Sequence, residues 1–116
     1  MDKQAASIID EWGKVREKLD ELFRSRDMKN TKEWMEKGIG LFIRFLFKTN
    51  DKSFFQGPIP YDQLEIKPVN IEERLAFILN RPNLYHSYRQ LVELMIEQEK
   101  QFAIRNSIKK SSSPNG

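Results

Sequence analysis

Residues 67–91 decide the fold, and they read K-P-V-N-I-E-E-R-L-A-F-I-L-N-R-P-N-L-Y-H-S-Y-R-Q-L. This stretch holds a helix start, a helix break and the single histidine of the chain. Asn70 and Glu73 have the spacing of a capping box, which predicts a helix that begins here. Pro82 pushes Arg81 out of the helical region, so this third helix is predicted to end after about ten residues.

A long fourth helix is predicted downstream, over residues 83–108. Its buried stripe is expected at Leu84, Tyr88, Leu91, Val92, Met95, Phe102 and Ile108. Upstream, residues 5–26 place apolar side chains at helical spacing with charged ones between them, which predicts the first helix.

The second helix is predicted to begin at the letters N-T-K-E, where Asn30 caps and Glu33 reaches back. Its second half, residues 39–47, is apolar on almost every side. Such a helix needs several neighbours to cover it, so we expect it at the centre of the fold. Gly38 and Gly40 weaken the helix, and they indicate either close approach of another helix or a bend.

The connection over residues 49–70 contains three prolines, which forbid a continuous helix. One helical turn is predicted at residues 61–65, with Leu64 and Ile66 packed inward. Phe54 and Phe55 have no periodic context. We expect them to plug the core, and an exposed apolar patch is the alternative.

The predicted fold class is therefore all-α. It is a single compact bundle of four main helices, with a long Pro-containing connection between the second and third. One helical domain is expected over residues 1–110. Residues 111–116, S-S-S-P-N-G, form a tail that is disordered by composition.

Composition limits where the protein can act. The chain is 32% charged with a mean hydropathy of -0.67, and no apolar run approaches the roughly 20 residues that span a bilayer. The start M-D-K-Q-A-A-S lacks the basic and apolar regions of a signal peptide. We therefore expect a cytoplasmic protein with no membrane partner. The absence of cysteine excludes disulfides, thiol nucleophiles and thiolate metal sites.

The positive charge is confined to one end of the chain. Residues 1–100 contain 17 Lys and Arg and 17 Asp and Glu, so the net charge of +3 comes from Arg105, Lys109 and Lys110. A nucleic-acid footprint needs a basic face or stripe. Nucleic acid therefore stays open as a partner, but with weak support, and a solvated basic tail is the favoured interpretation.

Catalytic patterns are missing. His86 and Ser87 are adjacent and point about 100° apart on a helix, so they do not form a dyad. The residue three before His86 is Asn83, which excludes the Glu-x-x-His motif of di-iron bundles. There is no glycine-rich phosphate loop, and no cofactor is expected.

A carboxylate site for Mg²⁺ stays formally open on the third and fourth helices, although a solvated, salt-bridged face is favoured. Its candidate ligands are Glu72, Glu73, Glu93, Glu97 and Glu99.

The corner between the third and fourth helices is the candidate site. Its residues are Arg74, Arg81, Tyr85, His86, Tyr88 and Arg89. Tyr85, Tyr88 and Arg89 are spaced to share one helix face, where a phosphate or a partner's carboxylate would bind. A structural role is favoured: the aromatic rings fix the junction, and His86 or an arginine donates to carbonyls left open where the third helix ends.

The stretch at 67–91, followed by E-Q-E-K at 97–100, resembles the YpoC-like family of small uncharacterised proteins from Gram-positive bacteria. The similarity is strongest over residues 67–102. The family has no assigned catalytic residues, so the resemblance implies none here. Its members are often encoded near a DNA-repair glycosylase and a replication protein, so the resemblance implies a DNA-linked role without implying contact with DNA.

The favoured function is a non-catalytic module that binds an unknown protein partner. One alternative is an accessory factor for nucleic-acid repair or replication, which a basic face made of Lys29, Lys32, Lys37 and Arg44 would favour. The other is an enzyme with an unrecognised site near His86, which a deep pocket with buried carboxylates would favour.

Overall fold

The computed structural model describes the backbone of residues 2–111 and the side chains of residues 2–108. It contains α1 (Lys3–Ser25), α2 (Met28–Thr49), a single 3-10 turn η1 (Tyr61–Gln63), α3 (Ile71–Asn80) and α4 (Tyr85–Ser111). Over this described range there is no strand, and the all-α prediction is confirmed. The predicted tail lies outside the described residues apart from Ser111, which ends α4.

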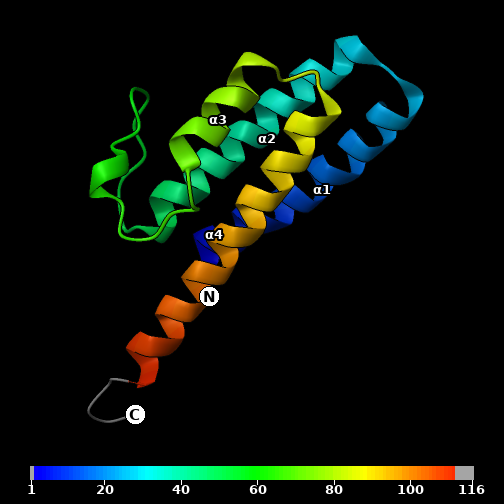
Figure 1. Cartoon of the computed structure of the whole chain (residues 1–116). Coiled ribbons are helices and arrows are strands. Elements are labelled where there is room, and N and C mark those ends of the chain that lie inside the picture. Colours follow the sequence, from blue (N-terminus) through cyan, green and yellow to red (C-terminus); the bar gives the residue numbers. More distant parts are fainter. Residues whose placement is uncertain (1, 112–116) are drawn as a thin grey trace.

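Helices α1 and α2 form an antiparallel hairpin, and α2 also packs against α4, which carries α3 (Figure 1). Phe42, Phe45 and Leu46 of α2 have no exposed surface, which confirms that α2 is the central helix. The C-terminal turns of α4 extend beyond the other helices (Figure 1). The molecule is therefore elongated, with extents of 54 × 26 × 22 Å. No described helix combines the length and the apolar character needed to cross a membrane.

A two-residue turn joins α1 to α2. Arg26 ends α1 in the left-handed conformation with φ 58°, and its N–H donates to carbonyls of the last turn. Asp27 then caps α2, because its carboxylate accepts the N–H of Asn30 at 3.1 Å. The prediction that Asn30 is the cap is therefore wrong, because Asp27 starts the helix three residues earlier.

The start of α3 also differs from the capping box that the sequence predicts. Asn70 precedes the helix in the left-handed conformation with φ 56°, and its side chain makes no capping hydrogen bond. Acidic residues Glu72 and Glu73 lie in the first turn, where the helix dipole favours negative charge.

The predicted stripe of α4 is buried at Tyr88, Leu91, Val92, Met95 and Phe102. It is wrong at its two ends. Leu84 is 40% exposed because α4 begins one residue later, and Ile108 is 62% exposed because it lies on the projecting end.

Gly38 permits the close approach that the sequence suggested. A methyl group there would lie 3.0 Å from a ring carbon of Trp12 and 3.2 Å from Leu91. Gly40 has a different environment, since a methyl group there would meet no packed atom within 4 Å.

The loop between α2 and α3 contains η1 near the predicted turn, with Leu64 buried and Ile66 partly buried. Phe54 and Phe55 are 50% and 49% exposed, so the prediction that they plug the core is wrong. Their rings lie 5.6 Å and 5.5 Å from that of Phe47. They cover this buried side chain from outside because the loop passes over the end of α2.

Candidate functional site

Arg74 joins α3 to α4 at the predicted corner. Its guanidinium donates to both carboxylate oxygens of Glu97, at 3.0 Å and 2.6 Å, and to the carbonyl of Val69 at 2.9 Å. It also donates to Gln90 at 3.2 Å. The hydrogen bonds to Glu97 raise the pKa of Arg74. Arg74 is therefore engaged within the fold.

The donor at the end of α3 is a serine. Ser87 is fully buried, and its hydroxyl donates to the carbonyl of Arg81 at 2.5 Å. His86 is exposed and packs edge-on against Phe77, with 5.4 Å between the ring centres. The expectation that His86 or an arginine donates to an open carbonyl at the end of α3 is therefore wrong. The Ser87 side chain points to the Arg81 carbonyl, whereas the His86 side chain points to solvent.

The two tyrosines of the corner have different environments. Tyr88 is buried, stacks on Phe23 and donates its hydroxyl to the carboxylate of Asp20 at 2.6 Å. Burial, with the hydrogen bond to Asp20, raises the pKa of Tyr88 to about 12. Tyr85 is 55% exposed, and Arg89 is also exposed. The predicted shared surface of Tyr85, Tyr88 and Arg89 is therefore wrong, because Tyr88 turns inward against α1.

The acidic side chains of α3 and α4 do not converge. Among residues with described side chains, no three His, Asp or Glu groups lie close enough to hold a metal ion. Glu97 is paired with Arg74 instead. The carboxylate site that the sequence left open is not assembled in this part of the chain.

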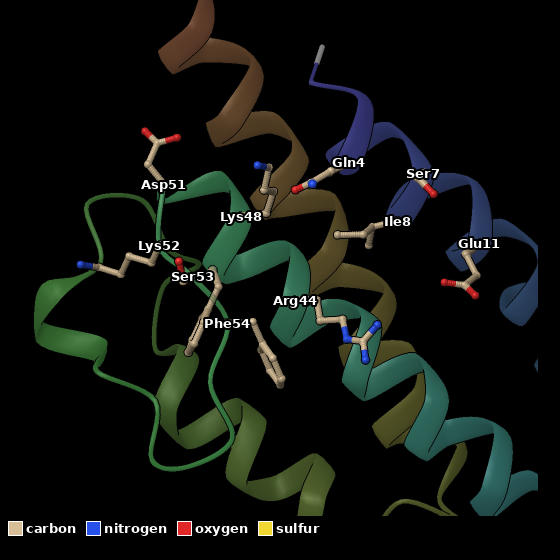
Figure 2. Close-up of a pocket in the computed structure, with 11 residues that line it drawn as sticks. Gln4, Ser7, Ile8, Glu11, Arg44, Lys48, Asp51, Lys52, Ser53 and Phe54 are labelled. Atoms are coloured by element: carbon tan, nitrogen blue, oxygen red, sulfur yellow. The ribbon is translucent and has the colours of Figure 1, made fainter.

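A groove lies along the seam between α1 and α2, at a distance in sequence from this corner. Its first half has a volume of about 700 Å³ and lies between the start of α1, the end of α2 and the loop that follows (Figure 2). Polar and charged side chains surround an apolar floor there. Its lining is Gln4, Ser7, Ile8, Glu11, Arg44, Phe47, Lys48, Asp51, Lys52, Ser53 and Phe54.

The second half adjoins the first, because Glu11 and Arg44 line both. It has a volume of about 540 Å³, and its remaining lining is Lys14, Val15, Trp34, Glu36, Lys37, Gly40 and Leu41. We call the two halves together the seam groove.

A cation lies over an aromatic ring in each half of the seam groove. The Lys37 ammonium is 4.2 Å from the ring centre of Trp34, and the Arg44 guanidinium is 5.7 Å from that of Phe54. Figure 2 shows Arg44 and Phe54 side by side, one from α2 and the other from the loop. Such pairs attract each other weakly at exposed sites, so they favour positions of the charged groups beside apolar surface.

The loop wall of the seam groove is held at its base by side-chain amides. Asn50 donates to the carbonyl of Ile66 at 2.9 Å and accepts the N–H of Ile66 at 2.9 Å. Gln101 pairs in the same way with Lys67, at 2.5 Å and 3.2 Å. The loop that carries Phe54 is therefore closed against both α2 and α4.

The sequence offered only partial signals for the seam groove. Phe54 and Phe55 lacked helical periodicity, and a core role was nevertheless expected for them, while Gly40 indicated only close approach of a helix or a bend. Pairing of α1 with α2 brings these features together, and that pairing could not be read from local patterns.

The fold and this groove define a class: a small all-helical protein with an open, mixed-charge groove on one side. The chain belongs to the YpoC-like protein family, whose pattern it matches over residues 2–110. It is 30% identical over 103 residues to the uncharacterized protein YpoC of Bacillus subtilis strain 168. That alignment covers 86% of this chain and 63% of the relative's length. No solved structure matches the chain.

Proposed function

We propose that this protein is a cytoplasmic, non-catalytic module that binds a protein partner through the seam groove. The observation that carries the proposal is the pair of cation–aromatic contacts along one open groove, Lys37 with Trp34 and Arg44 with Phe54. Two of these four residues, Trp34 and Arg44, are of types that are enriched among the residues that dominate protein-binding energy.

The exposure of the two loop phenylalanines supports the same proposal. Phe54 and Phe55 each leave about half of their surface in solvent, which is costly for adjacent large apolar side chains. The base of their loop is fixed by Asn50 and Gln101. A loop whose ends are joined has fewer conformations to lose when a partner binds.

The composition of the lining favours recognition over catalysis. Neither half of the seam groove is lined by a histidine, the usual general base at neutral pH. His86 lies on the exposed surface of α4 instead. The lining offers hydrogen bonds, charges and apolar contacts, which suffice for binding a polypeptide.

Affinity capture with a matched pair of charge reversals tests this function. Arg44→Glu changes a groove cation, and Lys29→Glu makes the same charge change on the exposed face of the same helix outside the groove. We expect proteins captured from a host extract by the parent to be retained by Lys29→Glu and lost with Arg44→Glu. Equal capture by both variants would contradict binding through the groove.

A nucleic-acid accessory factor is the second candidate, and one observation favours it. Lys29, Lys32, Lys37 and Arg44 are all exposed along α2. However, Glu33 and Glu36 lie on the same solvent side of the helix, and they interrupt the positive charge. If DNA is the partner, Lys29→Glu and Arg44→Glu should weaken binding alike, because phosphate contacts depend on the sum of nearby cations.

A further inference from the structure

Gly40 has no packing reason to be glycine. It lies inside α2, where glycine costs helix stability, and an added methyl group there would meet no packed atom within 4 Å. Gly38, one half-turn earlier, is different because Trp12 and Leu91 press against it. A methyl group at Gly40 would therefore enter open space, as it would at Gly13, but of these two glycines it is Gly40 that lines the seam groove.

That space is the floor of the second half of the seam groove. Gly40 lies there with Leu41 and Val15, and Trp34 forms part of the wall. A glycine floor lets another molecule approach the helix backbone closely, and the adjacent aliphatic side chains favour an apolar occupant.

The rim of the seam groove carries an excess of positive charge. Five cationic and three acidic side chains line its two halves. Two of the cations are already paired with acids outside the lining, Lys14 with Asp10 at 3.9 Å and Lys48 with Asp2 at 3.5 Å. The excess therefore rests on Lys37, Arg44 and Lys52. One of the acids, Asp51, is already 3.5 Å from Arg105, which lies outside the lining. Arg44 stands where the two halves meet, so its charge is available to an occupant of either half.

We infer that the seam groove accepts an acidic polypeptide segment with one bulky apolar side chain seated on Gly40. This inference rests on the proposed function and names the chemistry of the partner. The apolar anchor fills the space beside Trp34 and Leu41, and carboxylates on the segment pair with Arg44 and Lys37. Aspartate or glutamate on both sides of the anchor matches cations that occur in both halves of the groove.

A pair of glycine substitutions tests the inference without weakening the fold. Gly40→Leu fills the groove floor, and Gly13→Leu places the same side chain on the exposed face of α1, where a methyl group also meets nothing. Both changes replace glycine in a helix by a better helix former, so both variants should melt at or above the parent temperature. If Gly40→Leu loses affinity for a ligand and Gly13→Leu does not, the ligand binds in the groove.

The probe is a phage-displayed library of random peptides, about 12 residues long, selected on the parent protein. We expect the selected peptides to be acidic and to share an aromatic or large aliphatic residue. Their affinity for Gly40→Leu and for Arg44→Glu should fall about tenfold or more, while Gly13→Leu and Lys29→Glu should bind like the parent.

Other outcomes separate the inference from the function on which it rests. Selected peptides that are neutral or basic, yet sensitive to Gly40→Leu, would overturn the partner chemistry and keep the groove as the binding site. If the selected peptides and the captured host proteins all bind Gly40→Leu and Arg44→Glu as they bind the parent, both the proposed function and the inference would be overturned. Tight binding of labelled duplex DNA that Arg44→Glu and Lys29→Glu weaken equally would overturn the inference in favour of nucleic acid.

Discussion

Three side-chain amides hold the loop between α2 and α3 at its base. Asn50 directly follows α2, whereas Gln98 and Gln101 lie in α4, and all three contact the backbone of Ile66 or Lys67. An amide side chain supplies both a donor and an acceptor, so it can pair with a backbone segment as a neighbouring strand would. The position of the groove wall therefore depends on these polar contacts as well as on apolar burial.

Substitution of Asn50 by aspartate should destabilise the protein. Asn50 donates to the carbonyls of Leu46 and Ile66, and a carboxylate cannot do so. Each carbonyl keeps another donor, Thr49 for Leu46 and Gln98 for Ile66. However, two hydrogen bonds would be lost and a carboxylate would face two carbonyl oxygens in a largely buried site, so the free energy of unfolding should fall by about 1 to 3 kcal/mol. Urea denaturation at neutral pH measures this loss.

The control for that substitution is Asn106→Asp, which makes the same chemical change at an exposed position of α4. Its unfolding free energy should stay within about 0.5 kcal/mol of the parent. An equal loss of unfolding free energy in both variants would show that the loss comes from the added charge and not from the missing hydrogen bonds of Asn50.

Adjacent residues at the start of α4 should differ in their effect on stability. Ser87→Ala removes the hydroxyl that donates to Arg81, so we expect a loss of about 1 to 2 kcal/mol. His86→Ala removes an exposed ring that contacts Phe77 at its edge, and it should cost about 0.5 kcal/mol or less. Thermal melts of both variants check the ranking, and a larger loss at His86 would contradict it.

At the scale of the helices, the cap of α2 makes stability depend on pH. Hydrogen bonds from the side chain and the backbone N–H of Asn30 hold the pKa of Asp27 below its usual 3.8. The ionised carboxylate is thus favoured in the folded protein. Its contribution is present above pH 3.8 and is lost as the pH falls through the lower, folded pKa.

Asp27→Asn separates this contribution from capping itself, because asparagine is also a good cap but does not titrate. The difference in stability between parent and variant should be constant above about pH 5 and should shrink as the pH is lowered to about 2, with the parent losing more. Urea midpoints measured across this range give the comparison. If the urea midpoints of parent and variant differed by the same amount at every pH, titration of Asp27 would not contribute to stability.

The sequence predicted most helices well, and its errors have physical causes. Periodicity located α1 and α4, and Pro82 correctly marked the break after α3. The capping signals failed because Asp27 and Asn30 are both good caps, and the two-residue turn at Arg26 decides between them. The corner site failed at Tyr88, although the periodicity of the fourth helix had already placed this residue on the buried stripe. Its contact with Asp20 of α1 could not be read from the sequence, because it depends on packing between helices.

The core of α2 should be the most sensitive part of the fold to truncation. Phe45 has no exposed surface and packs edge-on against Phe102, with 6.2 Å between ring centres. Phe45→Ala should lower the unfolding free energy by about 3 to 5 kcal/mol, a large part of the roughly 5 to 15 kcal/mol typical of a domain. Phe54→Ala, at a half-exposed site, should cost clearly less in the same denaturation series.

At the scale of the whole molecule, charge balance limits the range of partners. Residues 1–100 contain equal numbers of basic and acidic residues, and the net charge of +3 arises in residues 101–116. In the described part of the chain, the cations of α2 alternate with Glu33 and Glu36. The local excess at the seam groove suits a short acidic segment better than a long polyanion.

Binding to nonspecific duplex DNA should therefore be weak at physiological salt. Each phosphate that a protein neutralises releases counterions and steepens the loss of affinity with salt, so a protein with few excess cations has a shallow salt dependence. We expect a titration by fluorescence anisotropy to show little change between about 50 and 200 mM salt, a range over which strong phosphate binders lose several orders of magnitude. Tight binding with a steep loss over that range would require a continuous basic surface, and it would make the nucleic-acid accessory factor the better-supported function.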